Sequence, residues 1–243
     1  MLTPASDAPG RACPFAPDEL DRLAAELEHG GAEATVRWAM ESFHPHLRLA
    51  CSFGGAGGMV LLQLALQVRP DVHVFVLDTG LLFPETYALI DEVERRYEVR
   101  VERARPPLTL EEQAARHGDA LWERDPDRCC ALRKVGPNAE ALGGDVRAWL
   151  TAIRREQTEN RGGTRAVEWN EKLGLVKVSP LVGWSERDAW RYLAEHDVPH
   201  NPLLDRGYAS LGCWPCTRPV APGEDSRAGR WAGFGKTECG LHT

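Results

Sequence analysis

Residues 47–58 read LRLACSFGGAGG and are followed by MVLLQLALQV at 59–68, and this stretch decides the fold. The apolar run from Leu47 to Phe53 predicts a short buried strand, Gly54 to Gly58 a loop, and Met59 to Val68 a buried helix. Glycines let a ligand approach the backbone, and the amides at a helix start attract an anion. The loop is neither a Walker A motif nor a complete G-x-G-x-x-G dinucleotide pattern. The unit predicts a site for a phosphate-bearing ligand, with a plain flexible turn as the alternative.

Strand and helix patterns alternate along the chain around this unit. Strands are predicted at residues 72–78, 98–104 and 147–153, and 175–178 reads as a further strand or part of a hairpin. Helices are predicted from Asp18, from Pro84 to Tyr97, and after Ser185 as N-cap. This alternation predicts an α/β fold with a mostly parallel sheet, flanked by helices on both faces, whose ligands bind at the carboxyl ends of the strands.

Composition limits the partners of the protein. The chain of 243 residues carries 29 Lys and Arg against 36 Asp and Glu, a formal net charge of −7. This balance argues against binding to nucleic acid or to an anionic membrane, since both need a basic field. No apolar run approaches the roughly 18 residues that span a bilayer, and no export signal is recognisable. We therefore expect a cytoplasmic protein with neither kind of partner.

Three segments are expected along the chain. Residues 1–17, rich in proline, predict a flexible leader, and residues 18–205 carry the alternating pattern of the α/β domain. In residues 206–243 regular patterns fade while glycine, proline and cysteine gather, as in binding loops. This last segment is predicted to be a cysteine-bearing loop followed by a mobile C-terminal tail.

Four of the seven cysteines form two pairs, Cys129-Cys130 and Cys213-Trp-Pro-Cys216. Two pairs brought together in space offer four thiolates to one metal centre. Adjacent cysteines are unusual ligands for a single zinc ion because their side chains diverge, whereas the separate irons of a cluster accept them more easily. An iron–sulfur cluster, a zinc ion, and unliganded thiols or a redox pair all remain open. Lys134 is expected near the pairs, as a cation that offsets thiolate charge.

Single charged and nucleophilic residues add further candidates. Cys239 lies in KTECGLH at residues 236–242, where Lys236 and His242 favour a reactive thiolate, although a lone terminal cysteine is often incidental. Arginines at 154–155 and 227–230 are candidate oxyanion clamps or surface ion-pair partners. Asp78 at a strand end is a site candidate or a turn-capping acid.

Seven motifs in order make the chain resemble the adenylyl-sulfate/phosphoadenylyl-sulfate reductase family, and within it the assimilatory adenylyl-sulfate reductases. They are SFGGA at 52–56, LDTG at 77–80, CC with RKV at 129–135, RREQ at 154–157, GCWPCTRP at 212–219, RAGRW at 227–231 and KTECGLH at 236–242. The resemblance covers the chain from about residue 47 to its end.

The resemblance implies an adenine-nucleotide α-hydrolase-like fold and a modified pyrophosphatase loop at residues 52–58. It implies one [4Fe-4S] cluster on Cys129, Cys130, Cys213 and Cys216. It also implies that Cys239 attacks the sulfur of adenylyl sulfate (APS), expels AMP and becomes an S-sulfocysteine, from which thioredoxin or a similar dithiol protein releases sulfite. The expected function is thus thioredoxin-dependent APS reduction in sulfate assimilation for cysteine biosynthesis, with self-association left open.

The matching positions also imply a set of substrate contacts. Lys134, Arg227 and Arg230, with His242, are expected at the sulfate, the loop at the phosphate, and Arg154 at the nucleotide. The full predicted substrate-binding set is Ser52, Phe53, Gly54, Gly55, Asp78, Lys134, Arg154, Arg227, Arg230 and His242. The chain departs from the family pattern at Gly57 and Gly58, where acidic residues are usual, at Ala152, and in an apparent insertion at residues 159–164.

Three alternatives compete with APS reduction. The same chemistry on phosphoadenylyl sulfate (PAPS), alone or beside APS, is the closest, but members restricted to PAPS usually lack the two cysteine pairs. An ATP pyrophosphatase, such as a tRNA thiolase or an amide-forming ligase, would keep a Ser-Gly-Gly-x-Asp-Ser loop, which is absent from this chain. A zinc-stabilised binding domain explains the paired thiols but not the tail around Cys239.

Overall fold

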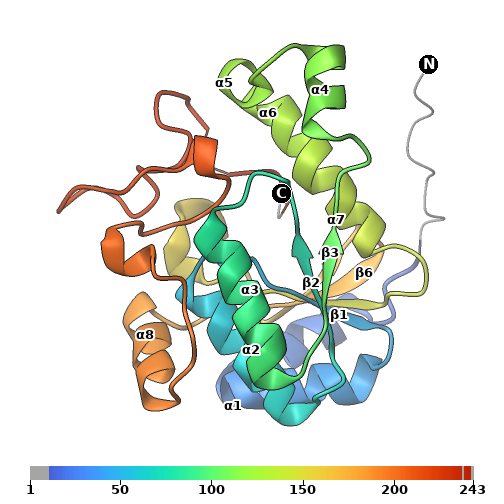
Figure 1. Ribbon diagram of the computed structural model, residues 1–243. Coiled ribbons are helices and arrows are strands. Elements are labelled where there is room, and N and C mark those ends of the chain that lie inside the picture. The colour runs from blue at the N-terminus through green and yellow to red at the C-terminus, as the bar shows by residue number, and fades with distance from the viewer. Residues whose placement is uncertain (1–10, 237, 242–243) are drawn as a thin grey trace.

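The computed structural model describes residues 11–236 and 238–241, and its centre is a six-stranded sheet (Figure 1). The strands lie in the order β3-β2-β1-β4-β6-β5, and each neighbouring pair is parallel except β5 with β6. This confirms the predicted α/β class with a mostly parallel sheet. The strands are β1 Leu47–Ala50, β2 His73–Leu77, β3 Val101–Ala104, β4 Ala148–Leu150, β5 Val167–Asn170 and β6 Leu175–Val178.

Both faces of the sheet are buried, as expected where helices cover parallel strands. Successive side chains along a strand point to opposite faces. Val74 and Val76 of β2 therefore belong to the larger hydrophobic core, while Phe75 between them packs with Trp149 of β4 in the smaller one. Trp149 is 1% exposed. The continuous apolar strands predicted from the sequence thus pack against hydrophobic residues on both faces of the sheet.

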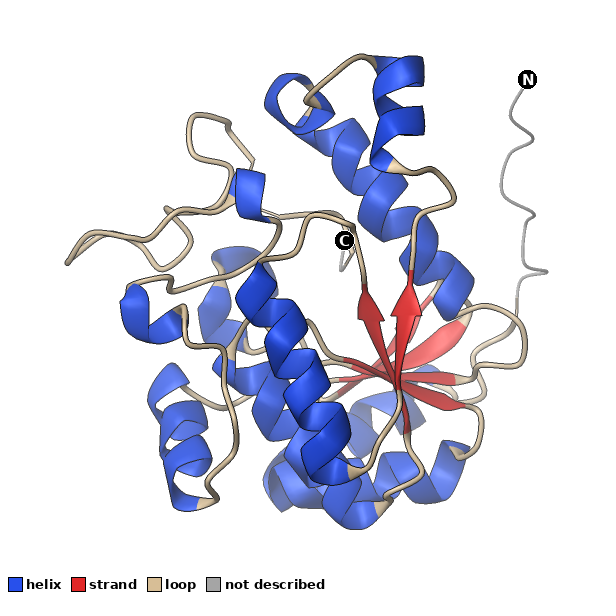
Figure 2. Cartoon of the chain, viewed as in Figure 1, coloured by secondary structure: helices blue, strands red, loops and turns tan. Residues whose placement is uncertain are grey.

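Helices cover the two faces unequally (Figure 2). Four helices contribute to the larger core, and they are α1 Pro17–Phe43, α2 Ala56–Val68, α3 Pro84–Tyr97 and α8 Glu186–Glu195. On the opposite face α7 contributes Ala141 to the smaller core, and it spans Gly136–Ala141. The predicted N-cap Ser185 is confirmed, because its hydroxyl accepts a hydrogen bond from the amide of Asp188 at 3.1 Å.

The segment between β3 and β4 forms a chain of short helices. They are α4 Leu110–His117, α5 Leu121–Arg124 and α6 Pro126–Cys130, and a π-helical turn at Ala131–Val135 joins α6 to α7. In Figure 1 these helices extend beyond the carboxyl ends of β2 and β3. The cysteine pair at 129–130 therefore stands above the ligand-binding edge of the sheet.

The turn after β1 differs from its predicted bounds. β1 ends at Ala50 instead of Phe53, since Phe53 adopts a φ of 54°, which lies outside the strand region. α2 begins at Ala56 with Gly55 as its N-cap, so Gly57 lies in the first helical turn and not in a loop. The turn is therefore confined to residues 51–55, and the helix amides begin directly behind it.

Three other predicted elements are also shorter or differently paired. The strand predicted at 98–104 begins only at Val101, because Glu98 ends α3 with a φ of 51°. The strand predicted at 147–153 ends at Leu150, beyond which the chain turns into the 3₁₀ turn Arg155–Gln157. β6 both extends the parallel sheet and forms an antiparallel pair with β5, so the hairpin interpretation is correct.

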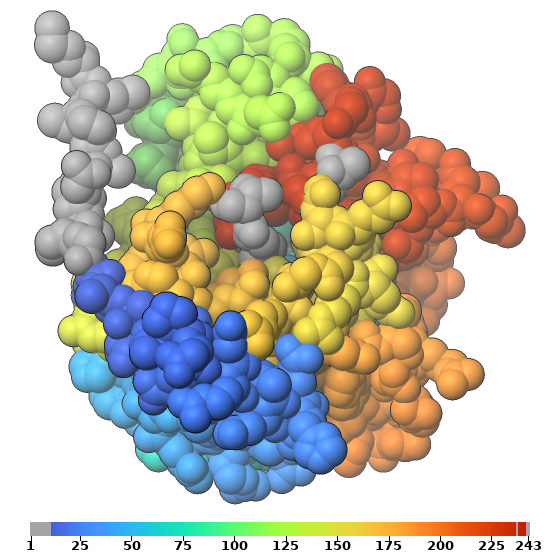
Figure 3. Space-filling view, turned by 180° about the vertical axis from the view of Figure 1, so that it is seen from behind, coloured from blue at the N-terminus to red at the C-terminus, as the bar shows by residue number. Residues whose placement is uncertain are grey.

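The C-terminal region lacks long elements, as predicted. After α8 the described chain holds 3₁₀ turns at Leu204–Arg206 and Trp214–Cys216. Viewed from behind in Figure 3, residues that follow β4 (yellow) border the C-terminal segment (red). A hydrogen bond of 2.9 Å from Arg161 to Glu238 joins the two segments. Parts of the chain far apart in sequence thus meet at one edge of the sheet.

Part of the predicted leader contacts the domain. Residues 1–10 of this segment lie outside the described residues, but Arg11 donates hydrogen bonds to the carbonyls of Gly144 and Val146. Phe15 lies beside Trp38 with ring centroids 6.4 Å apart. The packed chain therefore starts before Asp18. Within the described residues, no helix combines the length and apolar composition needed to cross a bilayer.

Candidate active site

A cavity of about 270 Å³ lies at the carboxyl ends of β1, β2 and β4. The strand order reverses between β1 and β4, and open α/β sheets bind ligands at such a switch point. The cavity walls come from the turns after β1 and β4, residues 209–212 and the C-terminal tail. The predicted site residues that line it are Ser52, Gly54, Gly55, Lys134, Arg154, Arg227, Arg230 and Cys239.

Asn201 holds the turn after β1 in place. Its side-chain amide, fully buried, donates to the carbonyl of Phe53 at 3.1 Å and to the hydroxyl of Thr86 at 3.0 Å. Phe53 itself is buried in the larger core and is absent from the cavity lining. Sequence reasoning missed Asn201, although Asn before Pro202 is a turn signal. The turn thus presents Ser52, Gly54 and the amides of α2 to the cavity.

Arg154 follows β4 and lies almost fully buried in the cavity wall. Its guanidinium forms an ion pair with Glu186 and lies 3.6 Å from a carboxylate oxygen of Glu156. A Cβ on Gly57 would stand 2.6 Å from Nη1 of Arg154, so any larger residue at position 57 would require the guanidinium of Arg154 to shift. The departure at Gly57 therefore creates room for a buried cation.

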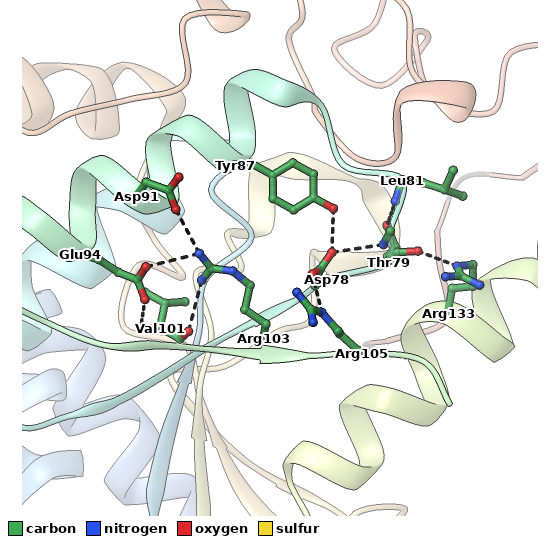
Figure 4. Close-up of polar contacts among 11 residues, drawn as sticks. Asp78, Thr79, Leu81, Tyr87, Asp91, Glu94, Val101, Arg103, Arg105 and Arg133 are labelled. Atoms are coloured by element: carbon green, nitrogen blue, oxygen red, sulfur yellow. Dashed lines mark hydrogen bonds and ion pairs between the residues drawn. The ribbon is translucent and has the colours of Figure 1, made fainter. Parts of the chain in front are cut away.

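Asp78 lies beyond β2 and outside the cavity lining. Figure 4 shows its carboxylate accepting hydrogen bonds from Tyr87 at 2.7 Å, from Arg105 at 2.9 Å and from the amide of Gly80 at 3.2 Å. Burial raises the pKa of Asp78, but the bonds from Tyr87 and Arg105 outweigh it and the net pKa lies below the ordinary value. These contacts match the alternative in which Asp78 caps the turn.

The two cysteine pairs, far apart in the sequence, influence one another electrostatically. Burial raises the pKa of Cys129 to about 12, with smaller contributions from Cys130, Cys213 and Cys216, so all four thiols lie within electrostatic reach. Thr79 Oγ1 is 3.3 Å from Cys213 Sγ, which ties the second pair to the turn after β2. Among the described residues, no three His, Cys, Asp or Glu side chains are arranged to hold a single metal ion.

Lys134 connects the cysteine pairs to the cavity. It follows Cys130 by four residues, but the π-helical turn Ala131–Val135 replaces the expected α-helical spacing. Burial lowers the pKa of Lys134, while Cys213, Cys239 and Cys130 raise it, and the net shift is upward. Its ammonium therefore stays charged between the paired thiols and the tail.

The neighbouring cations of the cysteine pairs have other roles. Arg133 is buried and donates to the carbonyl of Thr79 at 2.6 Å and to Oε1 of Gln113 at 3.1 Å, a structural tie between two loops. Arg128 is exposed, and Arg218 pairs with Glu224, whose pKa this pairing lowers to about 2. Of the four basic residues near the cysteine pairs, Arg128, Arg133, Lys134 and Arg218, it is Lys134 that lines the cavity.

Arg230 reaches the cavity through a gap left by Gly212. A Cβ on Gly212 would overlap with Nη2 of Arg230, so any larger residue at position 212 would displace the guanidinium. The guanidinium lies over the ring of Trp231 at 4.5 Å and donates to the carbonyl of Leu211 at 3.0 Å. Arg227, on the same turn of chain, lies 3.4 Å from the carboxylate of Glu238.

Several donors in this region are held without a partner. The Nε atoms of Arg154, Arg161 and Arg230 are buried and have no hydrogen-bond partner within the described part of the chain, and all three residues line the cavity. Buried polar groups are normally satisfied. Unsatisfied guanidinium donors at one cavity therefore indicate a ligand with several anionic oxygens.

The C-terminal tail closes one side of the cavity. Cys239 and Leu241 line it, and the thiol of Cys239 is partly exposed. The predicted contact His242 lies outside the described residues. The arrangement therefore places a thiol, five cations and a glycine turn ahead of a helix N-terminus around one space. Such a site can bind a phosphate-bearing ligand and direct a sulfur nucleophile at it.

Comparison with known proteins agrees with the motifs and the fold. Residues 46–219 match the model of the phosphoadenosine phosphosulfate reductase domain. The adenosine 5'-phosphosulfate reductase of Salinibacter ruber is 46% identical over 233 residues, which cover 96% of this chain and 92% of that protein. Adenosine 5'-phosphosulfate reductase 1 of Bacillus subtilis is 48% identical, over 87% of this chain and 91% of the relative.

Solved structures show the same architecture. The phosphoadenylyl-sulfate reductase of Candida auris, crystallised with phosphate, has a TM-score of 0.76 at 33% identity and covers 86% of this chain and 100% of that one. An FMN adenylyltransferase of Candida glabrata shares the fold alone, with a TM-score of 0.55 at 14% identity, over 87% of this chain and 70% of that chain. The family model covers well over half of the chain and the relatives align along nearly their whole length, so the chain belongs to the phosphoadenosine phosphosulfate reductase family.

Proposed function

We propose that the protein reduces APS to sulfite and AMP, with Cys239 as the nucleophile. The proposal rests on one observation. Cys239 lines the same cavity as Lys134, Arg227 and Arg230, and the glycine turn after β1 lines it too. The names of the curated relatives support APS as the substrate. The two cysteine pairs favour the same choice.

The proposed reaction proceeds in three steps. The thiolate of Cys239 attacks the sulfur of APS, an S–S bond forms, and the S–O bond to the phosphate breaks with its electron pair leaving on AMP. A thiolate of thioredoxin, or of a similar dithiol protein, then attacks Sγ of Cys239 and expels sulfite. The second thiol of that protein reduces the mixed disulfide, which regenerates Cys239. The dithiol supplies both electrons and is itself oxidised to a disulfide.

The side chains of the cavity have separate tasks in the first step. In this proposal Lys134, Arg227 and Arg230 hold the sulfate oxygens, whose negative charge opposes an approaching thiolate. The turn at Ser52 and the N-terminus of α2 hold the phosphate, which stabilises the charge of departing AMP. Arg154 contacts the nucleotide through its unsatisfied Nε. Binding in this orientation aligns the thiolate with the leaving oxygen.

The four paired cysteines are proposed to hold one [4Fe-4S] cluster. The thiols come from two segments and lie within electrostatic reach of one another. A four-iron cluster suits this donor set because each thiolate binds a different iron. The cluster, when bound, supplies a fixed arrangement and a local field at Lys134 and is not required as an electron carrier.

The proposed location of the protein is the cytoplasm, because cysteine thiols stay reduced in that compartment.

The proposed function is tested by purifying the protein without oxygen and comparing sulfite release from APS and from PAPS with reduced thioredoxin. We expect higher kcat/KM for APS, together with about four irons and four sulfides per chain. Without dithiol, APS should leave a covalent sulfite group on Cys239, visible by peptide mass. Faster turnover of PAPS, or zinc in place of iron, would contradict the corresponding part of the proposal.

Gly57→Ala is expected to weaken AMP binding about tenfold, since the added methyl displaces Arg154 and loses a charge-assisted hydrogen bond. The matched control is Gly58→Ala, whose Cβ would lie 3.5 Å from Cys51 Sγ, an ordinary contact. Both variants add one methyl group to the same helical turn. Calorimetric titration with AMP measures the difference, and equal affinities of the two variants would refute the role of Gly57.

A further inference from the structure

The residue before Cys239, Glu238, is held by a cluster of partly buried polar side chains. The carboxylate of Glu238 accepts a hydrogen bond from Arg161 at 2.9 Å and lies 3.4 Å from both Arg227 Nη2 and Thr158 Oγ1. The side chains of Glu238, Arg161 and Arg227 are only 12%, 13% and 17% exposed. At this depth an ion pair is weakly screened, and removing one partner leaves an uncompensated charge.

Arg161 belongs to the segment that reads as an insertion in the sequence. It ends the 3₁₀ turn Glu159–Arg161, and its Nη1 donates to Oε1 of Gln157. The same oxygen of Gln157 accepts the amide of Arg154 at 3.2 Å. The cluster around Glu238 is therefore connected, through two hydrogen bonds, to the arginine in the nucleotide wall of the cavity.

A second anchor lies on the other side of the tail. Lys236 forms an ion pair with Asp127 of α6, the helix that ends with the first cysteine pair, and its ammonium lies 5.3 Å from the ring centroid of Trp231. The tail is thus attached at Lys236 and at Glu238. Glu238 is the anchor that adjoins the proposed nucleophile.

We propose that Glu238 is a positioning residue, which through Arg161 holds the tail so that the thiol of Cys239 faces the substrate. This inference rests on the proposed role of Cys239. The shortest contact of the carboxylate is to Nη2 of Arg161, whereas the donor that this arginine leaves without a partner is its Nε, so Glu238 can stay in place when substrate binds. Restricting the tail in this way removes the entropy of orienting the nucleophile during the reaction.

A rival interpretation makes Glu238 an occupant of the anion site on Arg227, which substrate must displace. The two interpretations predict opposite effects of neutralising the carboxylate. A positioning residue affects the rate of the chemical step and leaves nucleotide affinity nearly unchanged. A displaced anion lowers affinity, so its removal strengthens substrate binding and leaves the chemical step intact.

The test compares Glu238→Gln, Arg161→Gln, the double variant and Arg161→Lys, with Glu159→Gln as control on an exposed position of the same turn. Three quantities are measured on the full chain purified without oxygen. They are AMP release in a single turnover with APS, the Kd for AMP, and the rate at which iodoacetamide alkylates Cys239, read by peptide mass.

We expect Glu238→Gln and Arg161→Gln to slow single-turnover AMP release by roughly tenfold to a hundredfold, with less than about a twofold change in Kd for AMP. The double variant should be no slower than the slower single variant, because both remove one interaction. Arg161→Lys should recover part of the rate that Arg161→Gln loses. Iodoacetamide should alkylate Cys239 faster in Glu238→Gln and in Arg161→Gln than in the wild type. Glu159→Gln should match the wild type in all three measurements.

Several outcomes would overturn the proposal. Tighter AMP binding with an unchanged rate in Glu238→Gln supports the displaced anion, and a large loss of AMP affinity in Arg161→Gln makes that arginine a substrate contact instead. Additive losses in the double variant indicate separate roles. If the wild type itself forms no S-sulfocysteine, the proposed function fails, while unchanged alkylation rates would still refute the positioning of the tail.

Discussion

Cys239→Ser is expected to abolish sulfite release from APS, with a loss of more than about a thousandfold in kcat/KM. Serine keeps the size of the side chain, but its hydroxyl is not ionised near neutral pH and is a far weaker nucleophile than a thiolate. The variant should bind AMP like the wild type, because Cys239 lies at the cavity edge and the turn after β1 is unchanged. Sulfite assays and AMP titration measure both properties.

The matched control for this variant is Cys13→Ser. Cys13 is also a partly exposed free cysteine, and it is absent from the cavity lining. It should retain full activity and should still acquire the covalent sulfite group on Cys239. Substantial turnover by Cys239→Ser would refute the nucleophilic role and would direct attention to another thiol.

The second large effect is expected from Cys130→Ser, which removes one of the four proposed cluster ligands. We expect loss of bound iron and of visible cluster absorbance, and a fall in kcat of about a hundredfold, since metal-site neighbours lose their arrangement. Lys134 lies four residues after Cys130, in the π-helical turn, so we expect its ammonium to lose its proposed place at the sulfate. Iron and sulfide content and visible absorbance measure the loss of the cluster, and single-turnover AMP release measures the loss of activity.

Cys51→Ser provides the matched control for a buried thiol. Burial raises the pKa of Cys51 to about 12, its thiol lies 3.6 Å from the carbonyl of Gly58, and none of the paired cysteines contributes to the shift in its pKa. This variant should keep its iron. A cluster-free Cys130→Ser protein with full turnover would show that Lys134 is positioned without a cluster.

The sequence predicted the fold well wherever burial alone sets the pattern. β2 is a continuous apolar run because both of its faces are covered, and its predicted bounds differ from the observed His73–Leu77 by one residue at each end. Predictions were less accurate where a single backbone dihedral ends an element. Phe53 and Glu98 both have positive φ, which side-chain periodicity does not reveal.

At the candidate site too, the sequence predicted some features correctly and others only the structure revealed. Motifs identified Cys239, Lys134, Arg227 and Arg230, which the structure places around one cavity. The same motifs also suggested Asp78, whose carboxylate instead accepts hydrogen bonds within its own turn and from Arg105. Neighbours in sequence share a motif whether or not their side chains point the same way, and only the packed structure separates them.

By itself, the sequence determined the family, the α/β class and the positions of the paired thiols and of the tail cysteine, because each depends on residue type, periodicity or order along the chain. The tertiary structure alone decided that Glu238 meets Arg161 and that Gly57 makes room for Arg154. These pairs are 77 and 97 residues apart, so no local pattern encodes their contact. Their meeting follows from the order of the strands, whose carboxyl ends bring distant loops to one edge of the sheet.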